Sequence, residues 1–67
     1  MMTSELESRI LSELESNNGV LLKSDIALLA MDSNGKIDSD FVERAIERLV
    51  SDKIIEEREF DILLIRH

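Results

Sequence analysis

The sequence contains no cysteine, proline, tryptophan or tyrosine, and its only histidine is His67. The lack of cysteine excludes disulfides and thiolate metal sites, and a single imidazole does not make a zinc site. No nucleophile–base pair and no glycine-rich phosphate loop is present. We therefore expect a protein that is not an enzyme, that holds no metal or cofactor and that has no small-molecule substrate.

Long apolar runs are also missing, and none approaches the roughly 20 residues that a membrane helix needs. The segment Met1–Ser8 is acidic and polar, unlike a secretory signal. These features predict a soluble, intracellular protein of the cytoplasm that does not bind a membrane. The lack of cysteine agrees with a reducing compartment.

The chain has 67 residues, a length that corresponds to one domain over residues 1–67. Hydrophobic residues make up 43% of the sequence and aromatic residues only 3%, which predicts a folded core of aliphatic side chains rather than disorder. A hydrophobic core of this size by itself supplies only a small free energy of unfolding. Tight packing or a partner chain must supply the remaining stability.

Three segments have the spacing of helices. In the first, Ser4–Asn18, the apolar residues Leu6, Ile10 and Leu14 share one face. Ser4, followed three residues later by a glutamate, forms a capping box, and Gly19 can take the left-handed conformation that ends the helix.

The second helix is expected to begin at Ser24 as its cap, and the third at Asp38 or Ser39, continuing to about Asp52. The polar cluster Asp32–Gly35 predicts a short turn between them, as in a helix-turn-helix.

The remaining apolar segments are too short for helices. Val20–Leu22 is a brief strand or an extended link. Ile54-Ile55 and Ile62–Ile65 predict two strands of a hairpin, with the turn near Phe60-Asp61. The expected order is therefore helix, short strand, helix, helix, strand, strand.

This order, with the residues that form it, resembles the winged helix-turn-helix regulators of the MarR-like and Lrp/AsnC-like kind. Lys23–Ala27 is similar to the family's x-x-D-I-A opening of the second helix, and Val42–Glu56 to its recognition helix, L-x-x-x-G-x-I motif and wing. Ile10–Leu14 and Gly19–Leu22 also match. The sequence departs at Lys53, where the family usually has glycine. The resemblance implies an α+β fold, a small winged helix of three helices with a short antiparallel β-hairpin wing.

A DNA-binding interpretation uses the basic residues of the third helix and the wing. Side chains near the N-terminal end of a recognition helix face DNA. The nucleic-acid-binding candidates are Ser39, Arg44, Arg48 and Arg58. The opposing interpretation places the two helix arginines in ion pairs on a solvated surface, with Asp40 one turn before Arg44.

The acidic residues of the chain argue against DNA binding. The net charge is −7 at pH 7, whereas a nucleic-acid-binding domain usually carries a basic patch. The third helix exposes three carboxylates that would repel phosphates: Asp40, Glu43 and Glu47. These residues are candidates for contact with a basic surface of a protein partner.

The last strand provides a second partner-binding candidate. Its residues Ile62, Leu63, Leu64 and Ile65 are all apolar, and successive strand residues point to opposite faces. Only one face can lie on the core, so the other is expected to meet another chain, either in a homodimer or in a larger assembly. The sequence leaves open whether residues 62 and 64 or residues 63 and 65 face outward. It also leaves open whether the first helix or the chain end packs over the outward residues.

Asp32–Asp38 resembles part of a calcium-binding loop, with Asp32 and Asn34 at ligand positions. Phe41 stands where the loop needs a bidentate glutamate. A calcium-binding module is therefore the weakest alternative, and we expect a polar turn instead.

The sequence thus predicts a non-catalytic winged-helix module for protein interaction. Its process, taken from the resemblance alone, would be transcription regulation or another DNA-processing assembly. The alternative is a dimeric, sequence-specific DNA-binding regulator of transcription.

Overall fold

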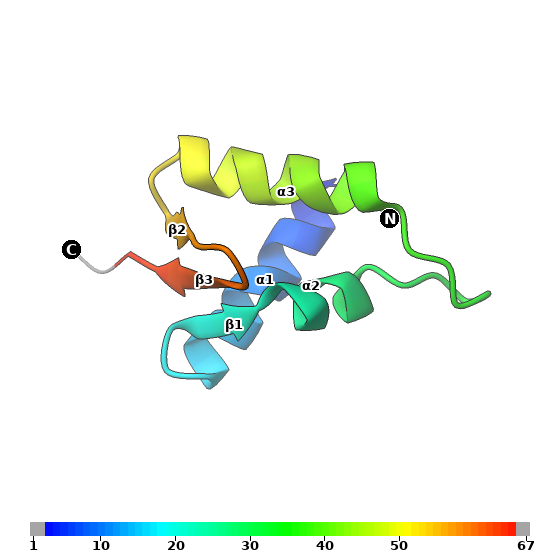
Figure 1. Ribbon diagram of the computed structural model, residues 1–67, viewed down its shortest axis with the longest axis horizontal. Coiled ribbons are helices and arrows are strands. Elements are labelled where there is room, and N and C mark those ends of the chain that lie inside the picture. Colours follow the sequence, from blue (N-terminus) through cyan, green and yellow to red (C-terminus); the bar gives the residue numbers. More distant parts are fainter. Residues whose placement is uncertain (1–2, 66–67) are drawn as a thin grey trace.

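A computed structural model describes residues 3–65. It contains three helices and a three-stranded antiparallel sheet, which confirms the α+β class. The elements follow the predicted order along the chain (Figure 1). They are α1 Thr3–Ser16, β1 Val20–Leu22, α2 Lys23–Leu29, α3 Ser39–Ser51, β2 Ile55–Glu57 and β3 Asp61–Leu64.

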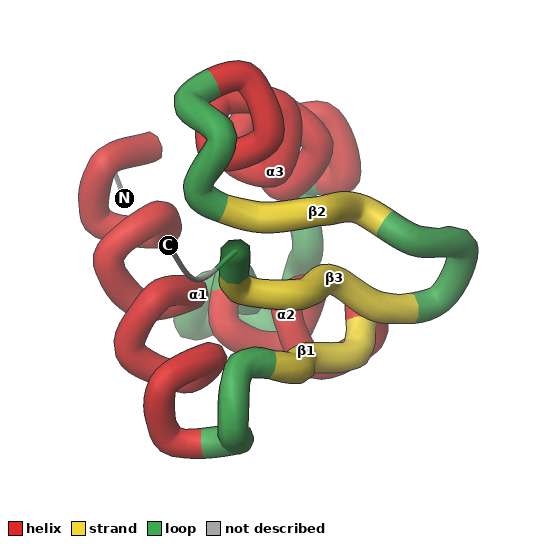
Figure 2. Tube along the Cα trace, turned by 90° about the vertical axis from the view of Figure 1, so that its left-hand side faces the viewer, coloured by secondary structure: helices red, strands yellow, loops and turns green. Residues whose placement is uncertain are grey.

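The sheet has the strand order β1-β3-β2, so the last strand lies in the middle. Leu63 pairs with Val20 of β1 on one side and with Glu56 of β2 on the other. The pairing extends one residue beyond β3, because the N–H of Ile65 donates to the carbonyl of Ile54 at 2.9 Å. Figure 2 shows the strands side by side, with α2 behind them, α3 above them and α1 at the left.

The core lies between α1, α3 and the inner face of the sheet. The predicted apolar face of the first helix is fully buried, and most of the periodic face of the third is buried as well, whereas Val50 at its end is 38% exposed. Every buried residue of the core is aliphatic, in agreement with the composition. The core consists of Leu6, Ile10, Leu14, Leu21, Ile26, Val42, Ala45, Ile46, Leu49, Ile55 and Ile62.

Two of the predicted helix starts were wrong. The first helix already includes Thr3, so Ser4 lies inside it, and the side chain of Glu7 pairs with Arg48 instead of closing a capping box. The second helix begins at Lys23 directly after the strand, without a side-chain cap. Its first N–H donates to the carbonyl of Phe60 at 2.9 Å, so the hairpin replaces the cap expected from Ser24.

The start of α3 was predicted correctly. Asp38 occupies the N-cap position, and its side chain accepts a hydrogen bond from the N–H of Phe41 at 3.2 Å. At the end of α1, the left-handed residue begins one position earlier than expected. Asn18 has φ 61°, and Gly19 follows with φ 86°.

The connection between α2 and α3 is longer than the predicted short turn, because α2 ends at Leu29 and α3 begins at Ser39. Asp32 closes a tight turn within it. Its Oδ1 accepts from the N–H groups of Asn34 and Lys36 at 2.8 and 2.9 Å. The connection projects beyond the helices at the right of Figure 1.

The hairpin turn also differs by one residue from the prediction. The N–H of Arg58 donates to the carbonyl of Asp61 at 2.9 Å, so Glu59 and Phe60 form the tip. Asp61 is the first residue of β3 rather than part of the turn.

Lys53 takes the left-handed conformation at the end of α3, with φ 60°. The N–H of Lys53 donates to the carbonyl of Val50, and the N–H of Ile54 to that of Leu49. This pair of bonds is the Schellman motif, in which glycine is the favoured residue at the left-handed position.

We expect Lys53→Gly to raise the free energy of unfolding by about 0.5–1 kcal/mol, since it removes a left-handed strain of about 1–2 kcal/mol and loses part of that gain to backbone entropy. Urea unfolding measures the difference. Lys53→Ala keeps the Cβ atom and is the matched control, so it should stay within about 0.3 kcal/mol of the wild type. Equal stability of the two variants would contradict the assigned conformation.

Candidate partner-binding surfaces

The outer face of the sheet carries four apolar side chains, Val20, Leu22, Leu63 and Ile65, which we call the outer sheet face. The strand register places Val20 beside Leu63 and leaves Leu22 beside Asp61. Val20, Leu22 and Ile65 are 41%, 50% and 37% exposed, and Leu63 is half-buried. In Figure 2 no described helix lies in front of this face.

The inner side of the same strand belongs to the core. Ile62 is fully buried, and Leu64 packs against the core from its edge. The structure therefore settles the orientation that the sequence left open, with residues 62 and 64 inward and residues 63 and 65 outward. This removes Ile62 and Leu64 from the predicted partner surface. Neither α1 nor any other described helix lies in front of this side of the sheet (Figure 2), and the chain end, the other cover considered, lies outside the described residues.

Two residues of this surface, Val20 and Leu22, were not among the predicted contacts. They come from β1, which is as apolar as β3. The argument that consecutive apolar strand residues occupy both faces applies equally to Val20–Leu22, and it would have found them. They belong to the outer sheet face because β1 is paired with β3 as a strand and is not merely an extended link.

The border of the outer sheet face is mostly acidic. Glu56 stands beside Leu63 in the register, and Asp61 beside Leu22. Arg58 also lies at this border, and its Nε is 3.8 Å from the Oε2 of Glu56. At the tip of the hairpin, Phe60 is 73% exposed.

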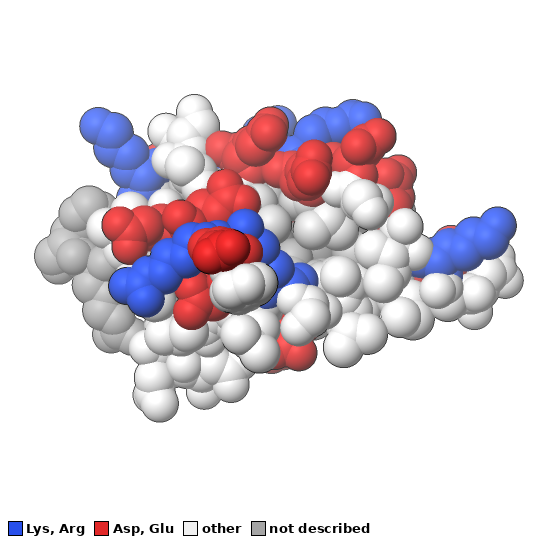
Figure 3. Space-filling view, viewed as in Figure 1, with Lys and Arg blue, Asp and Glu red and all other residues white. Residues whose placement is uncertain are grey.

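The predicted carboxylates of α3 form a second surface. Asp40, Glu43 and Glu47 are all exposed, and so is Ser39, the first residue of the helix. Figure 3 shows acidic atoms gathered over α3, with basic atoms along its upper edge and a mixed group of acidic and basic atoms below. This surface presents negative charge where the DNA-binding interpretation requires positive charge.

Two of the three arginines proposed for DNA contact have carboxylate partners within the chain. The Nε of Arg48 is 3.3 Å from the Oε1 of Glu7 on α1, whose side chain is only 13% exposed. Arg58 pairs with Glu56 in the hairpin. Arg44 is exposed on α3 and forms no ion pair with another described residue, so the expected pairing with Asp40 is not seen. The ion pair offsets the positive charge of Arg48, although the Arg48 side chain remains 67% exposed.

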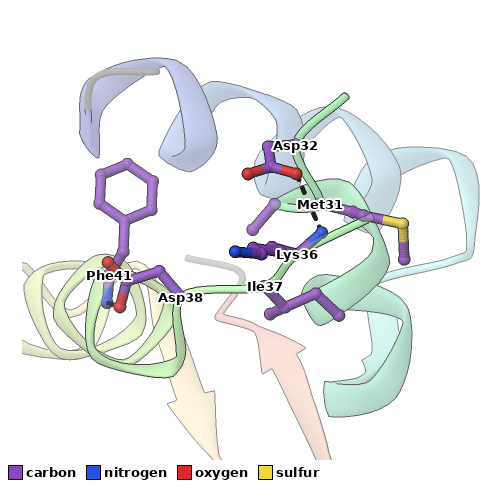
Figure 4. Close-up of a pocket in the computed structure, with 7 residues that line it drawn as sticks. Met31, Asp32, Lys36, Ile37, Asp38 and Phe41 are labelled. Atoms are coloured by element: carbon purple, nitrogen blue, oxygen red, sulfur yellow. Dashed lines mark hydrogen bonds between the residues drawn. The ribbon is translucent and has the colours of Figure 1, made fainter. Parts of the chain in front are cut away.

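A hollow of about 520 Å³ lies under the connection between α2 and α3. Figure 4 shows its lining, with side chains from the loop and from the start of α3. Its acidic groups already serve the fold, since Asp32 closes the loop turn and Asp38 caps α3. Within residues 3–65, no cluster of acidic or histidine side chains could hold a metal ion. The hollow is lined by Ala30, Met31, Asp32, Lys36, Ile37, Asp38 and Phe41.

A smaller groove of about 220 Å³ lies between α2 and α3, next to the hairpin. We call it the helix groove. Its lining combines apolar side chains with charged residues at the edge. They are Lys23, Ala27, Ile37, Ser39, Val42, Glu43, Ile46 and Glu57.

Comparisons with protein-family models, with curated proteins and with solved structures found no match. No helix in the described part of the chain is both long and apolar enough to cross a membrane.

Proposed function

We propose that this protein is a non-catalytic winged-helix module that binds another protein through its outer sheet face. In this proposal it acts in the cytoplasm as an accessory or regulatory subunit in transcription or another DNA-processing assembly. The helix, strand, helix, helix, strand, strand order and the three-stranded sheet support the winged-helix part. The assignment to this process depends on the family resemblance alone.

The observation that carries the proposal is the apolar outer sheet face. Scattered apolar side chains are normal on protein surfaces, whereas a contiguous apolar patch with a polar border is typical of an interaction site. Val20 and Leu63 are direct cross-strand neighbours, and Leu22 and Ile65 flank them in the same sheet face. The core of a domain this small contributes little stability by itself. A partner that buries these side chains would add to that stability.

Charge indicates that the partner is a different protein with a basic border. The border residues Glu56 and Asp61 would meet their own like charges in many arrangements of two copies, and each copy carries a net charge of −7. Like charges brought together across an interface oppose association. A partner with lysine or arginine around an apolar centre complements the face.

We expect light scattering over a dilution series to give the mass of a monomer, 7.7 kDa, because the acidic border opposes self-association. A dimer that persists on dilution would make a second copy the occupant of the outer sheet face. Leu22→Ser should then dissociate that dimer, and Leu28→Ser on α2 serves as the control.

The alternative, a dimeric DNA-binding regulator, would use Ser39, Arg44, Arg48 and Arg58. We expect a random-sequence duplex to bind no tighter than about 10⁻⁴ M at physiological salt, the weak end of non-specific binding. Fluorescence anisotropy over a salt series makes the measurement. Tighter binding that weakens steeply with salt, and that Arg44→Ala reduces while Arg9→Ala does not, would favour the regulator.

Capture of the partner tests the proposed function. The wild-type chain, a Leu22→Ser/Leu63→Ser variant and a Leu28→Ser control are compared as baits after nuclease treatment of the extract. Leu28 is 59% exposed on α2 and is not a residue of the outer sheet face. We expect one protein to be retained by the wild type and by Leu28→Ser and to be lost from the double variant. Retention by all three baits, or loss of the partner on nuclease treatment, would reject the proposal.

A further inference from the structure

The helix groove has an apolar floor. Val42 and Ile46 of α3 are only 8% and 5% exposed, so their side chains form the edge of the core beneath it. Ala27 of α2 forms the other side with a single methyl group, which leaves space between the two helices. Ile37, which is 39% exposed, borders the groove from the connection.

Carboxylates border the groove on two sides. Glu43 comes from α3, and Glu57 comes from β2. The only basic residue among the lining groups is Lys23, and its Nζ is 3.0 Å from the Oε2 of Glu57. That ion pair neutralises one side and leaves Glu43 as the uncompensated charge.

We propose that the helix groove receives one apolar side chain of a protein partner, next to a lysine or arginine that pairs with Glu43. The volume of about 220 Å³ is below the roughly 300–1,000 Å³ of pockets for drug-sized ligands, so it suits a single side chain. This inference rests on the proposed function, because it assumes a protein partner, and it adds the chemistry of a second contact.

Short peptides test the groove directly. The probes are a blocked pentapeptide with leucine between two lysines, a version with glutamates in place of the lysines, and a version with alanine in place of the leucine. Binding is followed by amide chemical shifts in NMR titrations of the 67-residue chain. We expect the first peptide alone to shift amides of α2 and α3 around Ala27, Val42 and Ile46.

Two variants and one control assign the binding to named side chains. Ala27→Leu fills the floor and should weaken binding by at least about tenfold, as the loss of a buried anchor does. Glu43→Lys should weaken it by about fivefold or more, the upper range of one exposed ion pair. Glu47→Lys, one turn further along the exposed side of α3 and outside the groove, should change it by less than about twofold. Melting curves confirm that each variant is folded.

Several results would overturn the inference. These are the absence of shifts around the groove, equal binding of the glutamate or alanine peptide, and equal weakening by Glu43→Lys and Glu47→Lys. The last result would indicate a diffuse attraction to acidic α3 without a groove contact. None of them affects the outer sheet face, whose test uses Leu22 and Leu63, so failure of the groove and failure of the proposed function are distinguishable.

Discussion

Ile62→Ala is expected to lower the free energy of unfolding by about 3 kcal/mol, within the range measured for aliphatic residues cut to alanine in cores. Ile62 is fully buried in the central strand of the sheet, between Leu21 of β1 and Glu57 of β2. The alanine would leave a cavity where the sheet meets the helices. Because one core in a chain of this length rarely supplies more than about 3–5 kcal/mol, the variant should keep no more than about 2 kcal/mol and be only marginally stable at room temperature.

The neighbouring residue is the matched control. Leu63 is only half-buried and faces outward, so Leu63→Ala should cost less than about 1 kcal/mol, as is usual for surface positions. Urea unfolding followed by circular dichroism compares the variants. If Ile62→Ala is too unstable to measure, Ile62→Val should lose about 1 kcal/mol. Equal losses at the two positions, or a larger loss at Leu63, would contradict the inward and outward assignment on which the outer sheet face depends.

Leu22→Ser is expected to reduce affinity for the protein partner by about 30-fold or more while leaving stability unchanged or higher. Truncating a central apolar contact costs about 2 kcal/mol or more in interfaces, which corresponds to this factor. Leu22 is 50% exposed and stands at the N-cap position of α2 without a side-chain hydrogen bond. Serine is a favoured N-cap and can add up to about 1 kcal/mol there.

Opposite changes in stability and binding distinguish a docking role from a structural one. Titration calorimetry with the captured partner gives the affinity, and thermal unfolding gives the stability. The control, Leu28→Ser, makes the same leucine-to-serine change at an exposed position of α2. It should change the affinity by less than about threefold, as substitutions at peripheral positions do. Reduced affinity accompanied by a matching loss of stability would indicate that Leu22 supports the fold only.

Much of the fold followed from periodicity in the sequence. Leu6, Ile10 and Leu14 recur at helical spacing, and the structure buries all three. The Asp38 cap was predictable because its hydrogen bond to the N–H of Phe41 is local. The start of α2 was not, because its first N–H is satisfied by the carbonyl of Phe60, far along the chain. Long-range contacts of this kind override local capping preferences.

The candidate surfaces were predicted only in part for the same reason. The sequence indicated that β3 has two apolar faces, but its orientation follows from pairing with Leu21 and Ile55. The pair between Arg48 and Glu7 joins α1 to α3, whereas sequence spacing suggests pairs only within one helix. The helix groove likewise depends on how α2 and α3 lie against the hairpin.

Photo-cross-linking in the living cell tests the central proposal most directly. A photoreactive amino acid is placed at Leu22 or Leu63 in the outer sheet face, and at Leu28 on α2 as the control. We predict a covalent adduct with one protein from positions 22 and 63 and none from position 28. Adducts from position 28 alone, or no protein adduct from the outer sheet face, would contradict the assignment of this face as the docking surface.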